Sequence, residues 1–252
     1  MNVVISGASS GIGLALARHY LERGAKVAAL ARRGSLLEEL TNHYPGRVHV
    51  VALDVRDAAA LQAAASEIIA RNGAPDLVIA NAGVSHGTLT DDLADASVFQ
   101  DIMDTNVLGM VKTFQPFLAP MRVAKRGTLV GIASVAGFRG MPGSGAYSAS
   151  KAAAITYLES LRVDLRDSGI KVITICPGYI KTPMTDVNVH PMPFIIEADD
   201  AARRMARVIA RKQSFAVIPW QMGLVGRVLK LMPNAVYDWA FSHAPRKPRK
   251  TA

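Results

Sequence analysis

The segment GAYSASKAAAITYL, residues 145–158, places a tyrosine and a lysine four positions apart in an alanine-rich stretch of helical character. Residues four apart lie on one face of an α-helix, so the side chains of Tyr147 and Lys151 can converge on one site. A free phenol has a pKa of about 10 and is a poor acid–base group at neutral pH, but a neighbouring cation favours the phenolate and lowers that pKa. The pair therefore suits proton transfer at an oxygen atom.

Such proton transfer is what a carbonyl group needs when it accepts a hydride. Negative charge develops on its oxygen, so a proton donor and polarising hydrogen bonds must meet at that atom. Ser134, in the stretch GIASVAG, stands 13 residues before the tyrosine and offers a hydroxyl. We expect Tyr147 to be the acid/base, Lys151 to tune it and Ser134 to orient the substrate oxygen. An exposed amphipathic helix could carry an isolated tyrosine–lysine pair, so other motifs must decide.

A glycine-rich turn, SGASSGIG, falls where the first apolar run passes into a helical stretch. Its three glycines carry no Cβ atom, so the turn can be tight and a pyrophosphate can approach the helix N-terminus. The spacing G-x-x-x-G-x-G differs from the commoner dinucleotide fingerprint, and an ordinary strand-to-helix turn is the alternative. The predicted phosphate cradle comprises Gly7, Ser9, Ser10, Gly11, Ile12 and Gly13.

The end of the second apolar run indicates which nicotinamide cofactor to expect. It reads ALARR, with Ala31 where NAD-preferring Rossmann proteins usually place an acidic residue, followed by Arg32 and Arg33. A planar guanidinium without that carboxylate suits a 2′-phosphate, so we predict NADP(H). Two solvated arginines at the start of a loop are the alternative. The ends of the third and fourth runs add Asp54, Val55, Asn81, Ala82 and Gly83 to the predicted cofactor site.

Seven short apolar runs supply the framework that must position these residues. Most are continuously apolar, which is typical of parallel strands covered on both faces, and they alternate with helical stretches. This order predicts an α/β fold: a doubly wound, Rossmann-type parallel sheet of seven strands with helices on both faces. Nothing divides residues 1–219, so we expect one domain there and a helical appendage over residues 220–252. The predicted strands are 2–6, 26–31, 47–53, 76–80, 127–133, 171–176 and 214–219, and the predicted helices include 11–23, 58–72, 97–123, 146–167 and 198–212.

Taken together, these motifs resemble the short-chain dehydrogenase/reductase family over essentially residues 1–219. One departure is Ser6, where the family often has threonine. No single motif is specific, and the resemblance rests on the order and spacing of all of them. The motifs are the glycine turn, NAG at 81–83, Asn106 in DTNVLG, Ser134 in GIASVAG, YSASK at 147–151 and PGYIKT at 177–182.

The resemblance implies further roles. Tyr147 and Lys151 would also belong to the cofactor site, where Lys151 would bind the nicotinamide ribose hydroxyls. Asn106 would hold a water that links Lys151 to solvent as a proton relay. The segment after the sixth strand would lie over the nicotinamide, although a plain turn would also explain its first two residues. A homodimer or homotetramer built through the helices 97–123 and 146–167 is implied as well. The cofactor residues in that segment are Pro177, Gly178, Ile180 and Thr182.

The bulk composition fits a globular protein. Of 252 residues, 50% are hydrophobic and 19% charged, and the one cysteine, Cys176, lies inside an apolar run. No intrachain disulfide can form, and we expect a buried, inert thiol. The N-terminus shows no basic stretch before a cleavable apolar segment, and no run of about 18 apolar residues occurs. We predict a cytoplasmic protein that does not span a membrane.

Residues 183–196 contain three prolines and no clear period, which indicates a loop that covers the site. Apolar side chains there and after the catalytic serine offer an adaptable lining. We therefore expect a mainly hydrophobic ketone, aldehyde or alcohol as substrate, while ordinary core packing is the alternative reading of these side chains. They are Phe138, Met141, Met184, Met192 and Phe194.

Metal and nucleic-acid binding are not indicated. His86 and His190 form a conspicuous pair, but no spacing of cysteine, histidine and carboxylate residues supports a metal site. Residues 1–196 hold 18 Lys and Arg against 16 Asp and Glu, and no nucleic-acid-binding module is present. We predict neither a bound metal nor DNA or RNA as a partner.

The C-terminal segment is a separate electrostatic problem. Residues 197–252 hold 11 Lys and Arg against 4 Asp and Glu, and the chain ends in a basic tail that we interpret as solvated. The stretch 220–232 has a broad apolar face with Gly223, Gly226, Arg227 and Lys230 opposite it. A lid over the substrate cavity or packing between subunits is our leading interpretation, and peripheral contact with an anionic membrane is the alternative.

The leading prediction is an NADP(H)-dependent oxidoreductase that interconverts a carbonyl group and an alcohol by direct hydride transfer. A redox-neutral dehydratase or epimerase with tightly held cofactor would keep the fold and consume no NADPH. A redox-sensing NADP(H)-binding protein would control a partner through its basic C-terminal part. A pure sensor, however, has no chemical need for Asn106, Ser134, Tyr147 and Lys151.

Overall fold

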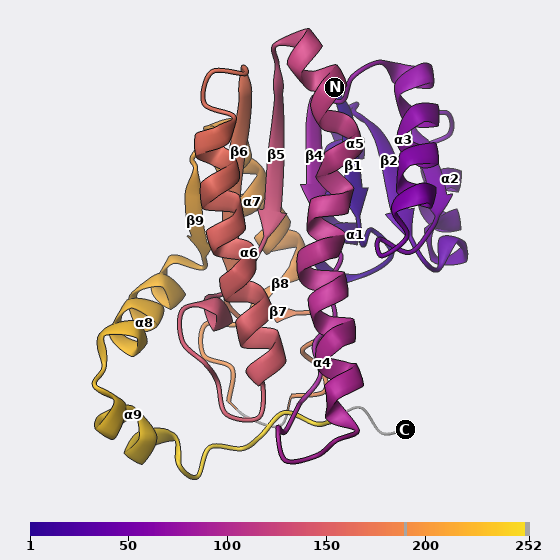
Figure 1. The fold of residues 1–252 in the computed structure, drawn as a ribbon. Coiled ribbons are helices and arrows are strands. Elements are labelled where there is room, and N and C mark those ends of the chain that lie inside the picture. Colours follow the sequence, from indigo (N-terminus) through magenta and orange to yellow (C-terminus); the bar gives the residue numbers. More distant parts are fainter. Residues whose placement is uncertain (189–190, 250–252) are drawn as a thin grey trace.

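Seven parallel strands form the centre of the molecule in the order β3-β2-β1-β4-β5-β6-β9 (Figure 1). The computed structural model describes residues 1–188 and 191–249. The chain winds outward from β1 to β3 and then returns to place β4 beside β1, which leaves a crevice at the carboxyl ends of these strands. The predicted doubly wound sheet is confirmed. Its strands are β1 Asn2–Ser6, β2 Lys26–Ala31, β3 Val48–Ala52, β4 Leu77–Ala80, β5 Gly127–Ile132, β6 Ile170–Pro177 and β9 Phe215–Ile218.

Helices cover both faces of the sheet because its strands are apolar on both sides. In β1, Val3 and Ile5 belong to one hydrophobic core and Val4 to the other. The second core holds the fully buried rings of Phe114 and Phe117. Burial on two faces is what the continuous apolar runs predicted. One face carries α1 Gly11–Glu22, α2 Glu38–His43 and α7 Ala198–Ala210, and the other carries α3 Ala58–Asn72, α5 Gly109–Ala124 and α6 Gly145–Asp164.

The long helix expected over 97–123 is interrupted. It consists of α4 Asp95–Met103, a π-helical turn Asp104–Leu108, and α5. The turn places Asn106 where its carboxamide bonds both backbone groups of Val84, and such turns often occur at functional sites. One extra residue in a turn barely alters the apolar period, so the sequence did not reveal it.

The loop predicted over residues 183–196 lies between two short strands that the sequence did not reveal. β7 Ile180–Lys181 pairs in parallel with β8 Ile196–Glu197, which directly precedes α7. The sequence analysis predicted neither of these short strands, nor α2 and the 3₁₀ turn Gly34–Leu37 before it.

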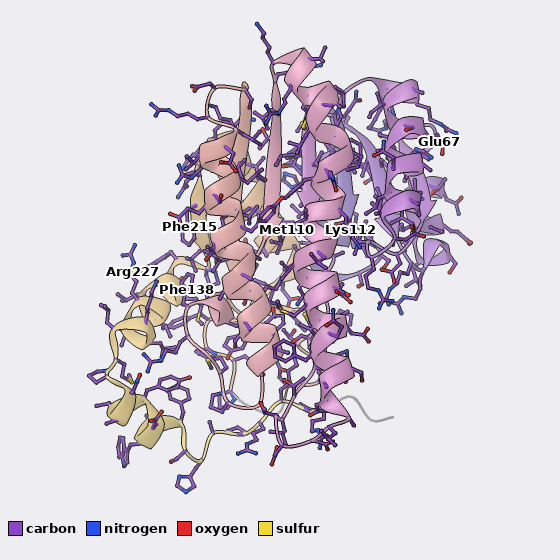
Figure 2. All side chains as sticks on the ribbon, viewed as in Figure 1. Glu67, Met110, Lys112, Phe138, Phe215 and Arg227 are labelled. Atoms are coloured by element: carbon purple, nitrogen blue, oxygen red, sulfur yellow. The ribbon has the colours of Figure 1, made fainter. Side chains whose placement is uncertain are left out.

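The C-terminal appendage contains α8 Trp220–Leu231 and α9 Asn234–Phe241, as the predicted helical segment required. The glycines of α8 face inward: a Cβ atom at Gly226 would lie 2.3 Å from the Phe138 ring, which stacks on Phe215 (Figure 2). One apolar stripe of α8 consequently faces outward, although Met222 is buried on the inner side. Its exposed members include Trp220, Leu224, Val228 and Leu231.

The prediction of a solvated basic tail is wrong for the residues described. Residues 242–249, here called the C-terminal strap, run from α9 beneath the start of α6 to α4 (Figure 1). Arg249 pairs with Asp92 and with the buried Asp95, so the tail is fixed by side chains that the sequence could not assign to it. Within the described ranges, no helix has the length and hydropathy required to cross a membrane.

Candidate active site

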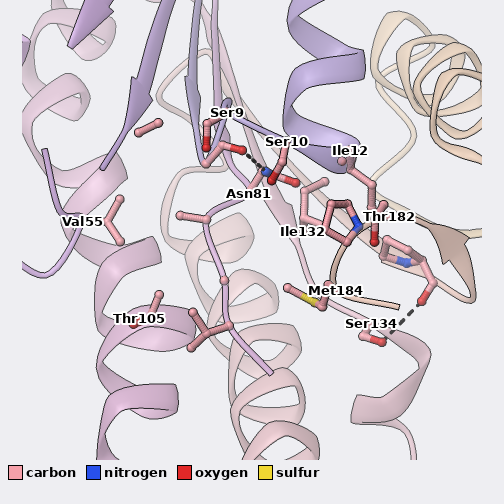
Figure 3. A pocket seen from close by; sticks show the side chains of 18 of the residues that line it. Ser9, Ser10, Ile12, Val55, Asn81, Thr105, Ile132, Ser134, Thr182 and Met184 are labelled. Carbon is pink, nitrogen blue, oxygen red and sulfur yellow. Dashed lines mark hydrogen bonds between the residues drawn. The ribbon is translucent and has the colours of Figure 1, made fainter. Parts of the chain in front are cut away.

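A cleft of about 260 Å³ lies at the carboxyl ends of the strands (Figure 3). Two predicted site residues stand behind its lining: Gly13, inside α1, and the fully buried Asn106. The other predicted residues are brought together around it. They are Gly7, Ser9, Ser10, Gly11, Ile12, Arg32, Arg33, Asp54, Val55, Asn81, Ala82, Gly83, Ser134, Tyr147, Lys151, Pro177, Gly178, Ile180 and Thr182.

The glycine turn is built for close approach. Gly7 has φ +67°, and a Cβ atom there would lie 2.7 Å from the Cα atom of Ala82. A Cβ atom at Gly13 would lie 2.2 Å from the carbonyl oxygen of Gly7, so side chains are excluded at both positions. No side chain caps α1 and its first turn holds no acidic residue, which leaves N–H groups free for an anion. The turn therefore fits a pyrophosphate.

Ser6 and Asn81 hold the turn against β4. The buried Ser6 Oγ accepts hydrogen bonds from the backbone N–H groups of Asn81 and Ala82 at 3.2 and 3.3 Å. The Asn81 carboxamide donates to the carbonyls of Ser6 and Gly7 at 3.2 and 3.1 Å. These contacts need only a hydroxyl group at position 6, so serine can replace the threonine that is common there.

Two exposed guanidinium groups and one carboxylate stand at the β2–β3 end of the cleft. Neither Arg32 nor Arg33 forms a salt bridge with any residue in the described part of the chain. Asp54 is held by Arg56, whose Nε and NH2 groups donate at 3.0 and 2.8 Å and keep the pKa of that carboxyl below its usual value. Unpaired guanidinium groups beside the apolar Ala31 suit a ligand phosphate.

Ser134, Tyr147 and Lys151 meet at the other end of the cleft. The Lys151 Nζ atom lies 5.7 Å from the centre of the Tyr147 ring, as expected for neighbours one helical turn apart on α6. Ser134 follows β5, accepts the Ala136 N–H at 3.1 Å and donates to the Pro177 carbonyl at 3.4 Å (Figure 3). The Ser134 hydroxyl precedes the 3₁₀ turn Val135–Gly137, and the Tyr147 phenol and the Lys151 ammonium belong to α6. Because this turn packs on α6, the three groups are held together.

Burial sets the protonation of this cluster. It raises the pKa of the Tyr147 phenol above its usual value, and hydrogen bonding with Ser134 acts in the opposite direction. It lowers the pKa of the Lys151 ammonium to about 8. Burial also raises the pKa of the Cys176 thiol to about 12, in agreement with the predicted inert thiol. At neutral pH the Tyr147 phenol is therefore protonated and lies beside a cation.

Asn106 is a buried support behind the cluster. Its carboxamide accepts from Val84 N at 2.8 Å and donates to Val84 O at 3.0 Å and Ser150 Oγ at 2.9 Å. A Cβ atom at Gly83 would lie 3.1 Å from Asn106 Oδ1 and 3.7 Å from Lys151 Nζ. The absence of a side chain at position 83 therefore keeps the carboxamide and the ammonium close to each other.

Several residues shape the cleft without a sequence signal. Thr185 donates from Oγ1 to Ile180 O at 2.7 Å and accepts the Thr182 N–H at 3.0 Å, which folds the segment after β7. In the sequence TPMT, residues 182–185, only Thr182 was given a role, and nothing marked Thr185 as important. Other lining residues to which the sequence analysis gave no role in the site are Leu30, Leu53, Val84, Thr105, Ile132, Ala133, Pro183 and Thr185.

The predicted apolar lining is only partly in place. Met184 lines the cleft, whereas Phe138 packs under α8 and Met141 contacts the Tyr237 hydroxyl. The Met192 sulfur accepts a hydrogen bond from the Asn188 carboxamide at 3.5 Å, and Phe194 is half exposed. Packing thus accounts for Phe138, as the alternative interpretation held.

No group of three or more His, Cys, Asp or Glu side chains within residues 1–188 and 191–249 is placed to hold a metal ion. Of the two histidines considered as a pair, His190 lies outside the described residues.

A family model described as short chain dehydrogenase matches residues 1–192. The chain belongs to the short-chain dehydrogenase family. An uncharacterized oxidoreductase of Myxococcus xanthus (strain DK1622) is 42% identical over 240 residues, which cover 94% of this chain and 94% of that protein. The family resemblance read from the motifs is confirmed.

Two solved structures of short-chain dehydrogenases and their relatives align with this one. A closed form of serine dehydrogenase complexed with NADP⁺ has a TM-score of 0.77 and 26% identity, covering 83% of this chain and 89% of that one. A family member from Burkholderia phymatum in complex with NAD has a TM-score of 0.82 at 23% identity, covering 99% and 98%, which shows the fold. This short-chain dehydrogenase is accordingly an oxidoreductase of a family that acts on CH–OH or C=O groups with nicotinamide cofactors.

Proposed function

We propose that this short-chain dehydrogenase uses NADP(H) to interconvert a mainly hydrophobic ketone or aldehyde and its alcohol. The observation that supports this most directly is the cluster of Ser134, Tyr147 and Lys151 at one end of the cleft whose other end carries the glycine turn. A phosphate cradle and an acid–base group in one cleft are what hydride transfer to a carbonyl requires.

The cofactor would be held along the whole cleft. The uncapped start of α1 and the close-packed glycines fit its pyrophosphate, and Arg32 with Arg33 would bind the 2′-phosphate. Lys151 would bind the nicotinamide ribose hydroxyls, and the backbone at Ile180 would meet the carboxamide. When bound, the nicotinamide supplies or accepts the hydride.

Tyr147 moves the proton in this proposal. Burial keeps its phenol protonated in the free protein, so in the reductive direction it is ready to donate to the carbonyl oxygen. Ser134 orients that oxygen, and the Lys151 ammonium favours the phenolate that remains. Asn106 has a further lone pair on Oδ1, and we assign to it a water that connects Lys151 with solvent.

The catalytic part is tested by NADPH oxidation against ketones and aldehydes of graded chain length and polarity. Tyr147→Phe should lower kcat by about 10²- to 10⁴-fold, the usual contribution of general acid catalysis, and change the NADPH Kd far less. Tyr157→Phe, on the same helix but in the core, is the matched control. Turnover that survives Tyr147→Phe, or a preference for small polar carbonyls, would contradict the proposal.

The cofactor assignment is tested by fluorescence titration with NADPH and NADH. Arg32→Ala should weaken NADPH about tenfold or more, as expected for the loss of a hydrogen bond between charged groups, and should leave NADH unchanged. Arg18→Ala removes an exposed arginine that already pairs with Glu39 and is the control. Equal weakening of both cofactors by Arg32→Ala would remove the 2′-phosphate assignment.

We further propose a homodimer or homotetramer. Exposed apolar side chains on the long helices, Leu108, Val123 and Val163, and on the outer face of α8 and α9 would be covered in such an assembly. Sedimentation of the wild type and of Trp220→Ser/Trp239→Ser measures this, since both indoles are largely exposed. Flotation of the wild type with anionic liposomes, lost in the double variant, would favour peripheral membrane contact by the same face.

A further inference from the structure

The C-terminal strap passes close to the Tyr147 ring, and none of its residues lines the cofactor cleft. Within the strap, Arg246 packs against the loop 138–143, since a Cβ atom at Gly143 would lie 2.8 Å from Arg246 Cβ. The strap then reaches residues 85–87, where the Gly87 N–H donates to the Pro248 carbonyl at 2.9 Å. A Cβ atom at Gly87 would lie 2.2 Å from the Lys247 carbonyl oxygen, so this glycine makes room for the strap.

The strap is anchored at its far end by charge. The buried Asp95 carboxylate accepts the Leu89 N–H at 2.7 Å and the Arg249 Nε–H at 2.9 Å. Arg249 also contacts Asp92, so it occupies both carboxylates near this end of the strap. Neither acid is left to neutralise the lysine two residues earlier.

That lysine reaches the catalytic tyrosine. Lys247 Nζ donates to Ser85 Oγ at 2.7 Å and lies 5.6 Å from the centre of the Tyr147 ring. Lys247 does not line the cofactor cleft, whereas Lys151, beside the same ring, does. The Lys247 ammonium therefore lies beside Tyr147 but outside the cofactor cleft, where it can contact a carbonyl substrate bound at the phenol.

Among the described residues, no acidic side chain forms an ion pair with the Lys247 ammonium. In the described part of the chain its one hydrogen-bond acceptor is a neutral hydroxyl, and it forms no salt bridge, although an ammonium has three donors. The side chain is half-buried, and burial lowers the pKa of Lys247. A substrate that fills the site expels water, and a cation without water or a partner is costly. An anionic group on the substrate would satisfy it.

We propose that Lys247, carried across the site by the C-terminal strap, binds an anionic group of the substrate beside the reacting carbonyl. The inference rests on the proposed oxidoreductase function and narrows its substrate class to hydrophobic carbonyl compounds that bear a carboxylate or phosphate. The strap lies beyond residues 1–192, the part that the family model matches, so this specificity would come from a segment outside the part common to the family.

The experiment compares ketones that carry a carboxylate two, three or four carbons from the carbonyl with their methyl esters. The wild type should prefer at least one acid over its ester. Lys247→Met, which keeps the apolar stem, should lower kcat/KM for that acid about tenfold or more, through KM, and leave the ester unchanged. Lys247→Arg should keep the preference. Arg246→Met, an exposed neighbour on the strap, is the control and should change neither. Preference for every ester, or equal loss for acid and ester in Lys247→Met, would overturn the proposal.

A second measurement does not depend on turnover. With NADP⁺ present and ionic strength held constant with sodium chloride, inorganic phosphate should raise the Tm of the wild type and of Lys247→Arg more than that of Lys247→Met. Equal shifts in all three proteins would refute the anion site. If no ketone is reduced but the phosphate effect depends on Lys247, the oxidoreductase proposal fails and the anion site stands.

Discussion

Lys151 Nζ donates a 2.9 Å hydrogen bond to the backbone carbonyl of Ile132, the last residue of β5. Ser134 stands two residues further along the chain, so one strand end positions both the ammonium and the hydroxyl. Because Tyr147 shares α6 with Lys151, the same bond also sets the distance between the phenol and Ser134. The carboxyl end of β5 thus fixes the positions of Ser134, Tyr147 and Lys151 relative to one another, and changes at each of the three have distinct consequences.

Ser134→Ala should move the pH dependence of reduction to higher pH. In the free protein, hydrogen bonding with Ser134 lowers the Tyr147 pKa, while burial raises it. Removing the hydroxyl leaves burial unopposed, so the phenol keeps its proton to higher pH and the alkaline limb of kcat/KM shifts upward. We also expect kcat to fall about 10²-fold, as for the loss of one oxyanion donor.

The control for that change is Ser148→Ala, on the same helix. Its buried hydroxyl accepts the Met141 N–H at 3.2 Å and is outside the cluster. It should leave the position of the alkaline limb unchanged. A limb that stays in place or moves to lower pH in Ser134→Ala would show that Ser134 does not act on Tyr147 as described.

The buried Lys151 should make stability depend on pH. Burial lowers its pKa to about 8 in the folded protein, against 10.5 for the free side chain. Below pH 8 both states hold the proton and the fold bears the full cost of the buried charge. Between pH 8 and 10.5 the folded state releases the proton first, so the unfolded state binds more protons and stability rises with pH.

Urea unfolding of the cofactor-free protein measures this effect. The free energy of unfolding of the wild type relative to Lys151→Met should increase by about 2–3 kcal/mol between pH 7 and pH 10.5. The comparison is needed because Cys176 and buried tyrosines have raised pKa values, which lower stability over the alkaline range. A difference that is flat with pH would mean that the Lys151 pKa is not lowered.

Gly13→Ala should damage the phosphate cradle from behind. Its Cβ atom would lie 2.2 Å from the Gly7 carbonyl oxygen and 2.5 Å from Asn81 Nδ2, so the turn must move. We expect a loss of about 1–3 kcal/mol in the free energy of unfolding, the usual range for overpacking, together with weaker NADPH binding. Gly140→Ala, where a Cβ atom would meet nothing within 4 Å, is the control. Equal stability of the two variants would argue against the tight packing of the turn.

Much of this site could be predicted because its signals are local. The apolar runs fixed the strand ends, and the glycine turn and the Tyr147–Lys151 pair each lie within one segment of the chain. The strap could not be predicted, since Arg249 meets Asp92 and Asp95 across more than 150 residues and a short basic tail has no periodicity. For the same reason Gly87 has meaning only once the Lys247 carbonyl is known to lie against it.

The orientation of α8 shows a different limit. Amphipathicity places an apolar stripe inward, but close approach to Phe138 and Val217 requires the small face, with Gly226 and Gly223, to be buried instead. The close packing of Gly226 on Phe138 and of Gly223 on Val217 sets the orientation of α8, and this packing cannot be predicted from the hydropathy pattern of the helix.

Arg249→Met should release the strap, because it leaves the Asp95 carboxylate buried without a cation. Breaking a buried ion pair is strongly destabilising, and since the Arg249 side chain is 39% exposed we expect a smaller but measurable fall in the free energy of unfolding. Arg249→Met/Asp95→Asn should recover part of that loss, whereas Asp92→Asn, at a carboxylate that is 40% exposed, should lower the free energy of unfolding less than Arg249→Met does. Hydrogen exchange at the Gly87 amide, which bonds Pro248, reports the strap directly and should accelerate in Arg249→Met but not in Asp92→Asn. If the amide stays protected in Arg249→Met, the strap is held by its backbone contacts, and the ion pair with Asp95 is not its anchor.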